Sequence, residues 1–474
     1  MIYSGGALEA EVPGVDLVSF TFERAEELGD KPALIDGLSG RALSYTELRR
    51  SVRSLAAGLA MHGFKPGETF AMFMPNAPEF AVAFYGSIAA GLRCTTANPL
   101  YTARELAFQL TDSGARVLLT VPAFVEVGRE AANTADCELF VLGEADGAAP
   151  FARLLGDPDT APHVDVDAAA DIAALPYSSG TTGLSKGVML SHRNLIANEL
   201  QMDASSLRVS GDEVVIAVLP FFHLYGLAVI LGLGLRSGAT LVTMPRFELG
   251  QYLELSERYR ATRAYVVPPI ALALATTPVV ETRDLSSLRT IFSAAAPLGS
   301  ELGEACARRL GCPVIQAYGM SELSPASHAA PLWATTKPGS VGRVLAGTEA
   351  RLVDPDTGED VATGERGEVW IRGPQVMLGY LNNPAATAAM IDRAGWLHTG
   401  DLATADEDGW FYIVDRLKEL IKYKAYQVAP AELEAILITH PHVADCAVIG
   451  VPDEEAGELP KAFVVPGSDA IDPG

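Results

Sequence analysis

The chain has 474 residues, 49% of them hydrophobic, and a formal net charge of −24 at pH 7. A chain of this length and apolar content can bury more than one core, so we expect at least two domains. The acidic excess and the lack of clustered Lys and Arg argue against nucleic acid as a partner, because a polyanion needs a basic surface.

Cysteine usage and the first residues favour a cytoplasmic protein. An odd number of cysteines with no CxxC pair argues against a disulfide framework and against a cysteine metal site. The N-terminal residues carry neither a basic nor an apolar signal segment. The cysteines are Cys94, Cys137, Cys306, Cys312 and Cys446.

Helical and strand patterns alternate through the first part of the chain, which predicts an α/β fold with parallel sheets covered by helices. We predict helices at Tyr45–His62, Pro78–Ala90 and Arg104–Ser113. We predict strands at Thr69–Met74, Val117–Thr120, Leu241–Met244, Tyr265–Val267 and Thr290–Ser293. The segment Ala145–Ala170, rich in Asp, Ala, Pro and Gly, is expected to be a surface loop.

A stretch of 22 residues, 214–235, contains no charged side chain and is long enough to span a membrane. Pro220, His223 and three glycines interrupt it. We therefore predict a buried strand at Val214–Leu219, a turn, and a buried helix ending near Ser237-Gly238, and no integral membrane association.

The pattern changes after Ala330, where frequent Gly and Pro turn signals predict a small antiparallel or β-barrel-like subdomain over about residues 331–414. From Asp415 a charged segment with a hinge near Lys418 leads to a helix start at Ala429-Pro430. We expect a large N-terminal domain over 1–414 and a small α+β domain over 415–474.

The segment Ser178–Lys186 is rich in Gly, Ser and Thr and ends in a lysine. Glycines let backbone N–H groups approach phosphate oxygens, hydroxyls add donors, and the ammonium neutralises charge. The Walker pattern fails, because Gly187 stands where Ser or Thr is required. The composition predicts a polyphosphate loop outside the P-loop NTPases; the alternative is a surface loop without a ligand.

This loop and four later segments, in this order, resemble the adenylate-forming superfamily of acyl-CoA synthetases, luciferases and peptide-synthetase adenylation domains. The later segments are Pro220–Gly226, Gln316–Pro325, Gly395–Asp401 and Asp415–Glu434. The last of these, together with Ser293–Leu298, is most similar to 4-coumarate–CoA ligases and their bacterial relatives.

The resemblance implies an ATP-dependent acid–CoA ligase that uses Mg²⁺ and coenzyme A and forms an acyl-AMP with release of pyrophosphate. It assigns catalytic roles to Lys186, His223, Glu322 and Lys422, with Glu322 also holding the metal. It assigns ATP or AMP contacts to Ser178, Ser179, Gly180, Thr181, Thr182, Gly183, Lys186, Gln316, Ala317, Tyr318, Gly319, Ser321, Asp401, Arg416 and Gln427. If the family resemblance is set aside, a tyrosine such as Tyr318 more often belongs to a hydrophobic core, and Thr399-Gly400-Asp401 reads as an ordinary turn.

For the acyl substrate the resemblance implies a pocket formed by His223, Tyr225, Ala294, Ala295, Ala296, Pro297, Met320 and Pro325. Three consecutive alanines leave room for a flat ring, which favours an aryl or arylpropenoyl acid; a medium-chain fatty acid stays open. The alternative for His223 is a core histidine.

Coenzyme A is expected near Arg246, Lys424 and Ala425, with His192, Arg193 and Phe247 as further candidates, although solvated surface side chains are the default for such residues. Ala425 stands where the family has glycine. The family's Pro-x-x-x-Ser-Gly-Lys segment has no counterpart, so we expect an incomplete C-terminal domain and slow adenylation by this chain.

Two other functions stay open: an adenylate-forming enzyme that loads a carrier-protein thiol or another acceptor, and a non-catalytic nucleotide- or acyl-binding protein. The oligomeric state is expected to be monomer or homodimer.

Overall fold

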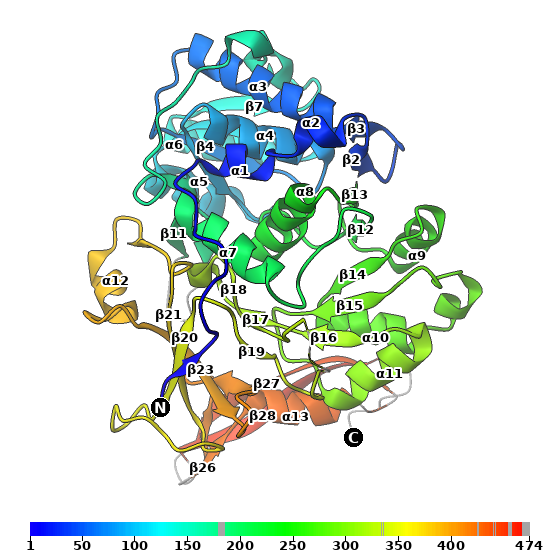
Figure 1. The fold of residues 1–474 in the computed structure, drawn as a ribbon, viewed down its shortest axis with the longest axis vertical. Helices are drawn as coiled ribbons and strands as arrows, with labels where there is room; N and C mark the ends of the chain where they lie inside the picture. Colours follow the sequence, from blue (N-terminus) through cyan, green and yellow to red (C-terminus); the bar gives the residue numbers. More distant parts are fainter. Residues whose placement is uncertain are drawn as a thin grey trace.

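The protein is described by a computed structural model that covers residues 1–178, 185–332, 334, 336–423, 426–438, 440, 442–453 and 457–466. Two helix-covered sheets occupy the upper and middle parts of the molecule in Figure 1, and antiparallel strands occupy the lower part. This confirms the predicted α/β class with parallel sheets and a separate β-rich region.

The first sheet contains the strands that precede and follow the predicted phosphate loop in the sequence. Its order is β8-β7-β6-β4-β5-β9-β11-β10, parallel from β8 to β9 and antiparallel at the β9-β11-β10 edge. Its strands are β4 (Thr69–Phe73), β5 (Arg93–Thr96), β6 (Ala115–Thr120), β7 (Glu138–Val141), β8 (Ala149–Pro150), β9 (Ile172–Ala174), β10 (Tyr177–Ser178) and β11 (Lys186–Ser191). A strand from much later in the chain, β22 (Gly379–Tyr380), pairs antiparallel with β11.

The helices of this part begin at local signals in the sequence. Ser44 and Glu47 form a capping box at α3 (Tyr45–Met61), and Thr102 and Glu105 form another at α5 (Ala103–Ser113). Proline is the first residue of α4 (Pro78–Ala89). Two further helices are α6 (Val125–Ala135) and α7 (His192–Asp203).

The second sheet has the order β16-β15-β14-β12-β13-β2-β3, and only the β2–β3 pair is antiparallel. Its strands are β2 (Pro32–Asp36), β3 (Ala42–Ser44), β12 (Val214–Ala217), β13 (Thr240–Thr243), β14 (Arg263–Val266), β15 (Thr290–Ser293) and β16 (Val314–Gln316). The associated helices are α9 (Leu249–Arg258), α10 (Pro268–Thr276) and α11 (Ser300–Leu310).

The uncharged stretch 214–235 forms the predicted strand, turn and buried helix, which consists of the π-helix η4 (Tyr225–Gly232) and α8 (Leu233–Ser237). Gly238 caps α8 with φ of 85°, a left-handed conformation that favours glycine. A Cβ at Gly226 would collide with the carbonyl oxygen of Pro220, so this turn also requires glycine. No helix in the described part of the chain is both long and apolar enough to span a bilayer.

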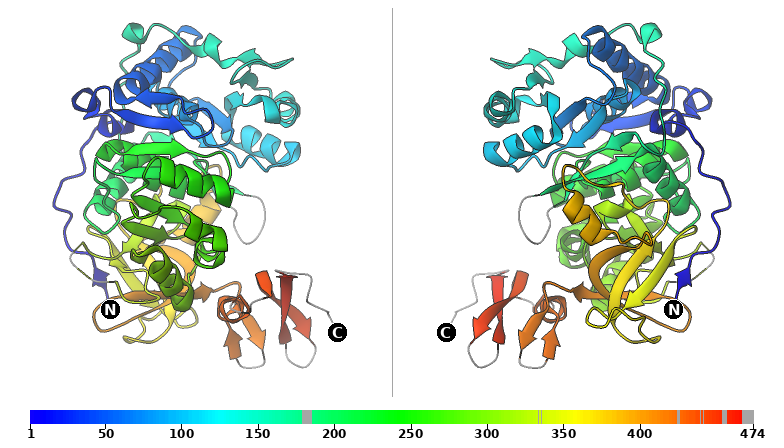
Figure 2. Two further views of the ribbon diagram at one scale, coloured as in Figure 1. Left: turned by 90° about the vertical axis from the view of Figure 1, so that its right-hand side faces the viewer. Right: turned by 90° about the vertical axis from the view of Figure 1, so that its left-hand side faces the viewer.

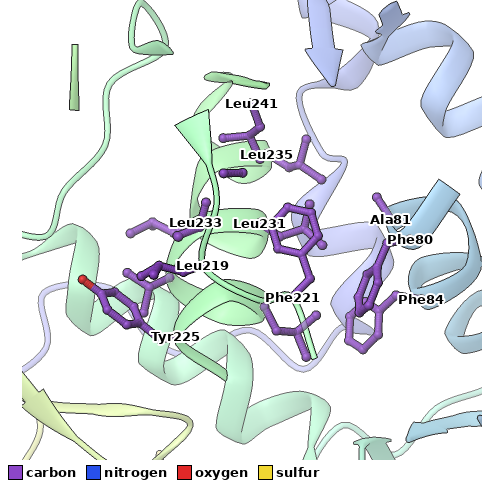
Figure 3. Packing of buried hydrophobic residues seen from close by; sticks show 14 of the residues in the cluster. Phe80, Ala81, Phe84, Leu219, Phe221, Tyr225, Leu231, Leu233, Leu235 and Leu241 are labelled. Carbon is purple, nitrogen blue, oxygen red and sulfur yellow. The ribbon is translucent and has the colours of Figure 1, made fainter. Parts of the chain in front are cut away.

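A common hydrophobic core joins the two sheets (Figure 3). Phe80 of α4 meets Phe221 edge to face, with ring centroids 5.5 Å apart. Leu231, Leu233 and other leucines of the η4–α8 helix continue this cluster. The predicted surface loop 145–170 also contributes to the core, because Phe151 and Leu154 lie buried in the short 3₁₀-helix Phe151–Leu154.

The β-rich region contains a five-stranded antiparallel sheet of order β1-β20-β21-β23-β24. Its strands are β1 (Tyr3–Ser4), β20 (Glu349–Val353), β21 (Gly367–Arg372), β23 (Leu397–Ala405) and β24 (Phe411–Arg416). An isolated bridge between Gly342 and Phe411 connects it to the three-stranded sheet of β17 (Tyr318–Gly319), β18 (Ala326–Ala329) and β19 (Arg343–Val344). The N-terminal segment reaches this region to supply β1 (Figure 1).

The C-terminal unit is the predicted small α+β structure, at the lower end of the molecule in Figure 2. It consists of β25 (Ile421–Tyr423), β26 (Tyr426–Val428), α13 (Pro430–Leu437), β27 (Val443–Asp453) and β28 (Gly457–Pro466). The Asp415 carboxylate links it to β24, because it accepts hydrogen bonds from the backbone N–H groups of Arg416 and Ala431. The proposed boundary at Val414 falls inside β24.

Candidate active site

A cavity of ≈ 830 Å³ lies where the two parallel sheets, the β-rich region and the start of the C-terminal unit meet. The structure brings most of the predicted site residues to its wall. These are Ser178, Lys186, His223, Tyr225, Ala294, Ala295, Ala317, Tyr318, Gly319, Met320, Ser321, Glu322, Pro325, Asp401, Arg416 and Lys418.

Glu322 forms the first polar corner of this cavity. It is 5% exposed, in the short 3₁₀-helix Ser321–Leu323, and its Oε1 accepts hydrogen bonds from Ser178 Oγ at 3.0 Å and Tyr380 OH at 2.7 Å. Lys186, the first residue of β11, places its Nζ 4.9 Å from the centroid of the Tyr380 ring. A carboxylate and an ammonium therefore stand next to the strand that follows the phosphate loop.

The Glu322 corner suits Mg²⁺ that is shared with a nucleotide. Among the described residues no group of three or more His, Cys, Asp or Glu side chains could form a protein cage for a metal. Mg²⁺ is commonly held by one or two carboxylates together with substrate phosphates and waters, so a single buried carboxylate in contact with Ser178, the first residue of the predicted phosphate loop, fits it.

Asp401 and Tyr318 form the second polar corner. Tyr318 OH donates a hydrogen bond of 2.5 Å to Asp401 Oδ2, and Arg416 Nε lies 3.6 Å from Oδ1. Asp401 and Arg416 are register partners on β23 and β24, so the antiparallel pairing fixes their separation. Burial raises the pKa of Asp401 to about 6, against the opposing effects of the Tyr318 hydrogen bond and the Arg416 charge. An ionised carboxylate here can accept hydrogen bonds from a sugar diol.

His223 precedes η4 and is open to the cavity, so it is not the core histidine of the alternative hypothesis. The backbone N–H of Tyr225 donates to its Nδ1 at 3.2 Å. The surrounding protein lowers the pKa of His223, because it removes water from the charged form. A neutral imidazole whose Nδ1 accepts carries its proton on Nε2, which can then donate to a carboxylate oxygen.

An apolar arm of the cavity lies between η4 and the loop after β15. Tyr225 presents its ring to the cavity while its hydroxyl donates to the carbonyl oxygen of Phe292 at 3.0 Å, so this hydroxyl is engaged by the backbone. Ala295 has φ of 73°, which turns the loop sharply beside the cavity. Apolar wall residues that the sequence did not single out include Leu207, Val229 and Phe222.

Several predicted residues lie elsewhere. Gln316, Ala296, Pro297 and Arg246 are not part of the cavity wall, and the Gln316 amide forms two hydrogen bonds with the backbone of Leu298. The expectation of a surface His192 was wrong: it is 3% exposed, and its Nδ1 accepts a hydrogen bond from the Leu17 backbone. Arg193 is exposed, and the Phe247 ring packs against Tyr252.

Some predicted residues fall outside the described part of the chain. These are Ser179, Gly180, Thr181, Thr182 and Gly183 of the phosphate loop, and Lys424 and Ala425 of the coenzyme A group. The side chains of Lys422 and Gln427 are likewise not described, although their backbones belong to β25 and β26.

Tyr380 is the functional candidate that the sequence reasoning missed. It belongs to a two-residue strand whose partner lies far earlier in the chain, so no local periodicity marks it. Its only sequence signal is the Gly379-Tyr380-Leu381 run, where glycine precedes an aromatic residue.

Comparison with known proteins agrees with this geometry. A family model described as AMP-binding enzyme matches residues 21–381, and the AMP-binding enzyme C-terminal domain matches residues 432–473. The chain is 46% identical over 459 residues to 4-coumarate–CoA ligase 5 of Oryza sativa subsp. japonica, covering 95% of this chain and 85% of that protein. It is 42% identical to 4-coumarate–CoA ligase 2 of Petroselinum crispum, with 95% and 84% covered.

A solved structure with the same fold is the anthranilate CoA ligase AuaEII in complex with anthranoyl-AMP, with a TM-score of 0.89 and 26% identity over 98% of this chain and 89% of that one. ATP-bound MatB from Rhodopseudomonas palustris gives a TM-score of 0.84 and 31% identity, covering 97% and 90%. The chain therefore belongs to the AMP-binding, adenylate-forming enzyme family.

Proposed function

We propose that the protein is an ATP-dependent carboxylic acid–CoA ligase that works through an acyl-adenylate. The observation that carries this proposal is the continuity of the cavity, which joins the Glu322–Lys186 corner, the Asp401–Tyr318 corner and an apolar arm beside His223. The names of the relatives, acid–CoA ligases, support the same activity.

The proposed reaction has two steps. A carboxylate oxygen of the acid, held by Nε2–H of His223, attacks the α-phosphorus of ATP, and the bond to the bridging oxygen breaks to release pyrophosphate. The thiol of coenzyme A then loses its proton to solvent, its sulfur attacks the acyl carbon, and AMP leaves with the electrons of the acyl–oxygen bond. Both steps depend mainly on positioning and charge neutralisation.

The residues divide between the two ends of the nucleotide. Ser178 and Lys186 would hold the departing phosphates, with Glu322 as the protein ligand of Mg²⁺, while Asp401 and Arg416 would hold the ribose. Mg²⁺ bound at this corner would neutralise charge on the phosphate oxygens. Lys418 lies at the cavity edge between β24 and β25, which supports its proposed role as the hinge between domains 1–414 and 415–474.

We propose an aryl or arylpropenoyl acid as the substrate class. Ala294 and Ala295 line the same cavity as Tyr225, and their small side chains leave space suited to a flat ring. The relatives act by name on 4-coumarate and anthranilate, which are both aromatic acids.

The test is to supply ATP, Mg²⁺ and a panel of acids, with and without coenzyme A, and to resolve the products by chromatography. We expect acid-dependent AMP and pyrophosphate, thioester only when coenzyme A is present, and no ADP. Acid-dependent ADP would overturn the assignment. Equal or better turnover of palmitate than of cinnamate-type acids would overturn the substrate class, and product formation independent of coenzyme A would favour another acceptor.

A further inference from the structure

Tyr380 contacts two groups that belong to different parts of the proposed nucleotide site. Its hydroxyl donates to Glu322 Oε1 at 2.7 Å, and its ring lies 4.9 Å from Lys186 Nζ. The side chain lines the cavity although the residue is only 5% exposed. A single side chain therefore touches both the candidate metal carboxylate and Lys186, which is also the register partner of Ser178.

The hydroxyl of Tyr380 leaves one oxygen of Glu322 available. Oε1 accepts two hydrogen bonds, from Ser178 and Tyr380, whereas within the described part of the chain Oε2 accepts none. A carboxylate held through one oxygen in this way can offer the other to a cation.

The backbone holds Tyr380 rigidly. Its strand is paired with β11 in the register Val188↔Tyr380, and the Leu381 N–H donates to the Gly187 carbonyl oxygen at 2.8 Å. The Tyr380 N–H donates to Thr387 Oγ1 at 2.9 Å. Because β11 begins at Lys186, the same strand pair fixes the distance between the Tyr380 ring and the lysine.

We propose that Tyr380 is a positioning residue that sets the metal–phosphate end of the nucleotide site, its hydroxyl orienting Glu322 toward the cation and its ring holding the Lys186 ammonium. This inference rests on the proposed function for the identity of the nucleotide. Both contacts come from one side chain, so a single substitution can remove one and keep the other.

Tyr380→Phe removes the hydroxyl and keeps the ring. Tyr45→Phe is the matched control, because Tyr45 OH donates an equally long 2.7 Å hydrogen bond to the Ala239 carbonyl oxygen in the core, away from the cavity wall. Tyr380→Leu removes the ring as well. Calorimetry measures ATP binding over a series of Mg²⁺ concentrations without acid or coenzyme A, so that no turnover occurs.

Mg²⁺ should increase the affinity for ATP. We expect the Mg²⁺ concentration that gives half of this increase to be about 10-fold higher for Tyr380→Phe than for the wild type, the effect typical of removing a residue that hydrogen-bonds a metal ligand. AMP binding and the affinity for ATP without Mg²⁺ should match those of the wild type and of Tyr45→Phe. Tyr380→Leu should in addition weaken ATP binding without Mg²⁺, because the lysine loses its support.

The proposal is overturned if Tyr380→Phe has the Mg²⁺ dependence of the wild type. It is also overturned if Tyr380→Phe lowers the melting temperature and weakens AMP and MgATP binding by the same factor, since a purely structural tyrosine would give that result. A wild-type protein that binds MgATP but forms no thioester would refute the ligase proposal and leave this binding result standing, so the two failures are distinguishable.

Discussion

Asp401 is a carboxylate that the fold keeps away from water, and we expect its replacement by asparagine to weaken nucleotide binding while stabilising the folded protein at neutral pH. The side chain is 14% exposed, and its strongest contact is the hydrogen bond from Tyr318. The amide oxygen of asparagine can still accept that hydrogen bond, so Asp401→Asn mainly removes the buried charge.

The size of the gain follows from the pKa. Burial raises the pKa of Asp401 from 3.8 to about 6, and at about 1.36 kcal/mol per pH unit this difference limits the effect to roughly 3 kcal/mol. Between these two pH values the native protein holds the proton that the unfolded chain has lost. The stabilising contribution is therefore complete below pH 3.8 and is lost as the pH rises through 6. Asparagine does not titrate, so the variant should gain stability relative to the wild type over this window.

Nucleotide affinity should change in the opposite direction. A hydrogen bond to a charged acceptor contributes about 1.5–3 kcal/mol, which corresponds to a loss of roughly one to two orders of magnitude in AMP affinity. Below pH 6 the wild type should itself lose AMP affinity as Asp401 takes up a proton.

Urea denaturation at pH 5 and pH 8 and calorimetry with AMP measure the two effects. Asp406→Asn is the control, because it removes a carboxylate that pairs with Lys337 at 2.6 Å outside the cavity wall. It should lose stability and keep its AMP affinity. An Asp401→Asn protein with unchanged AMP affinity, or with the stability and pH dependence of the wild type, would refute the reasoning.

Three further outcomes are expected. Lys186→Ala should weaken MgATP binding and leave AMP binding unchanged in calorimetry, because the ammonium stands at the phosphate end; an equal loss for AMP would place it at the nucleoside. Ala295→Leu should block aryl acids in the thioester assay, because the larger side chain fills space at the cavity wall, whereas Ala295→Gly should keep activity, because glycine adopts the φ of 73° without a Cβ clash. Glu213→Gln should lower the free energy of unfolding by about 3–5 kcal/mol in urea denaturation, because it leaves the buried Arg263 guanidinium without its anion; an unchanged free energy of unfolding would show that the pair is dispensable.

The sequence alone determined the elements whose signals are local. The capping box of Ser44 and Glu47, Pro78 at a helix start and Gly238 at a helix end place boundaries within a few residues, because capping acts over a single turn. The composition of the phosphate loop and the order of the motifs indicated the family for the same reason, since each motif is a short continuous segment.

Only the tertiary structure decided which side chains meet. Ser178 and Tyr380 reach the same oxygen of Glu322 from positions 144 and 58 residues away, and β22, which carries the tyrosine, is too short to show a period. The pairing of β1 with β20 and the burial of His192 are equally nonlocal.

The electrostatics of the site belong to this second group. A carboxylate in a Thr-Gly-Asp turn has an ordinary pKa in an unfolded chain. The pKa of Asp401 is higher because burial in the folded protein excludes water, and the hydrogen bond from Tyr318 offsets only part of this effect. The sequence shows which ionisable and polar groups are present. Their pKa values and contacts depend on desolvation and strand register, which are set by the packing of segments that are distant in the sequence.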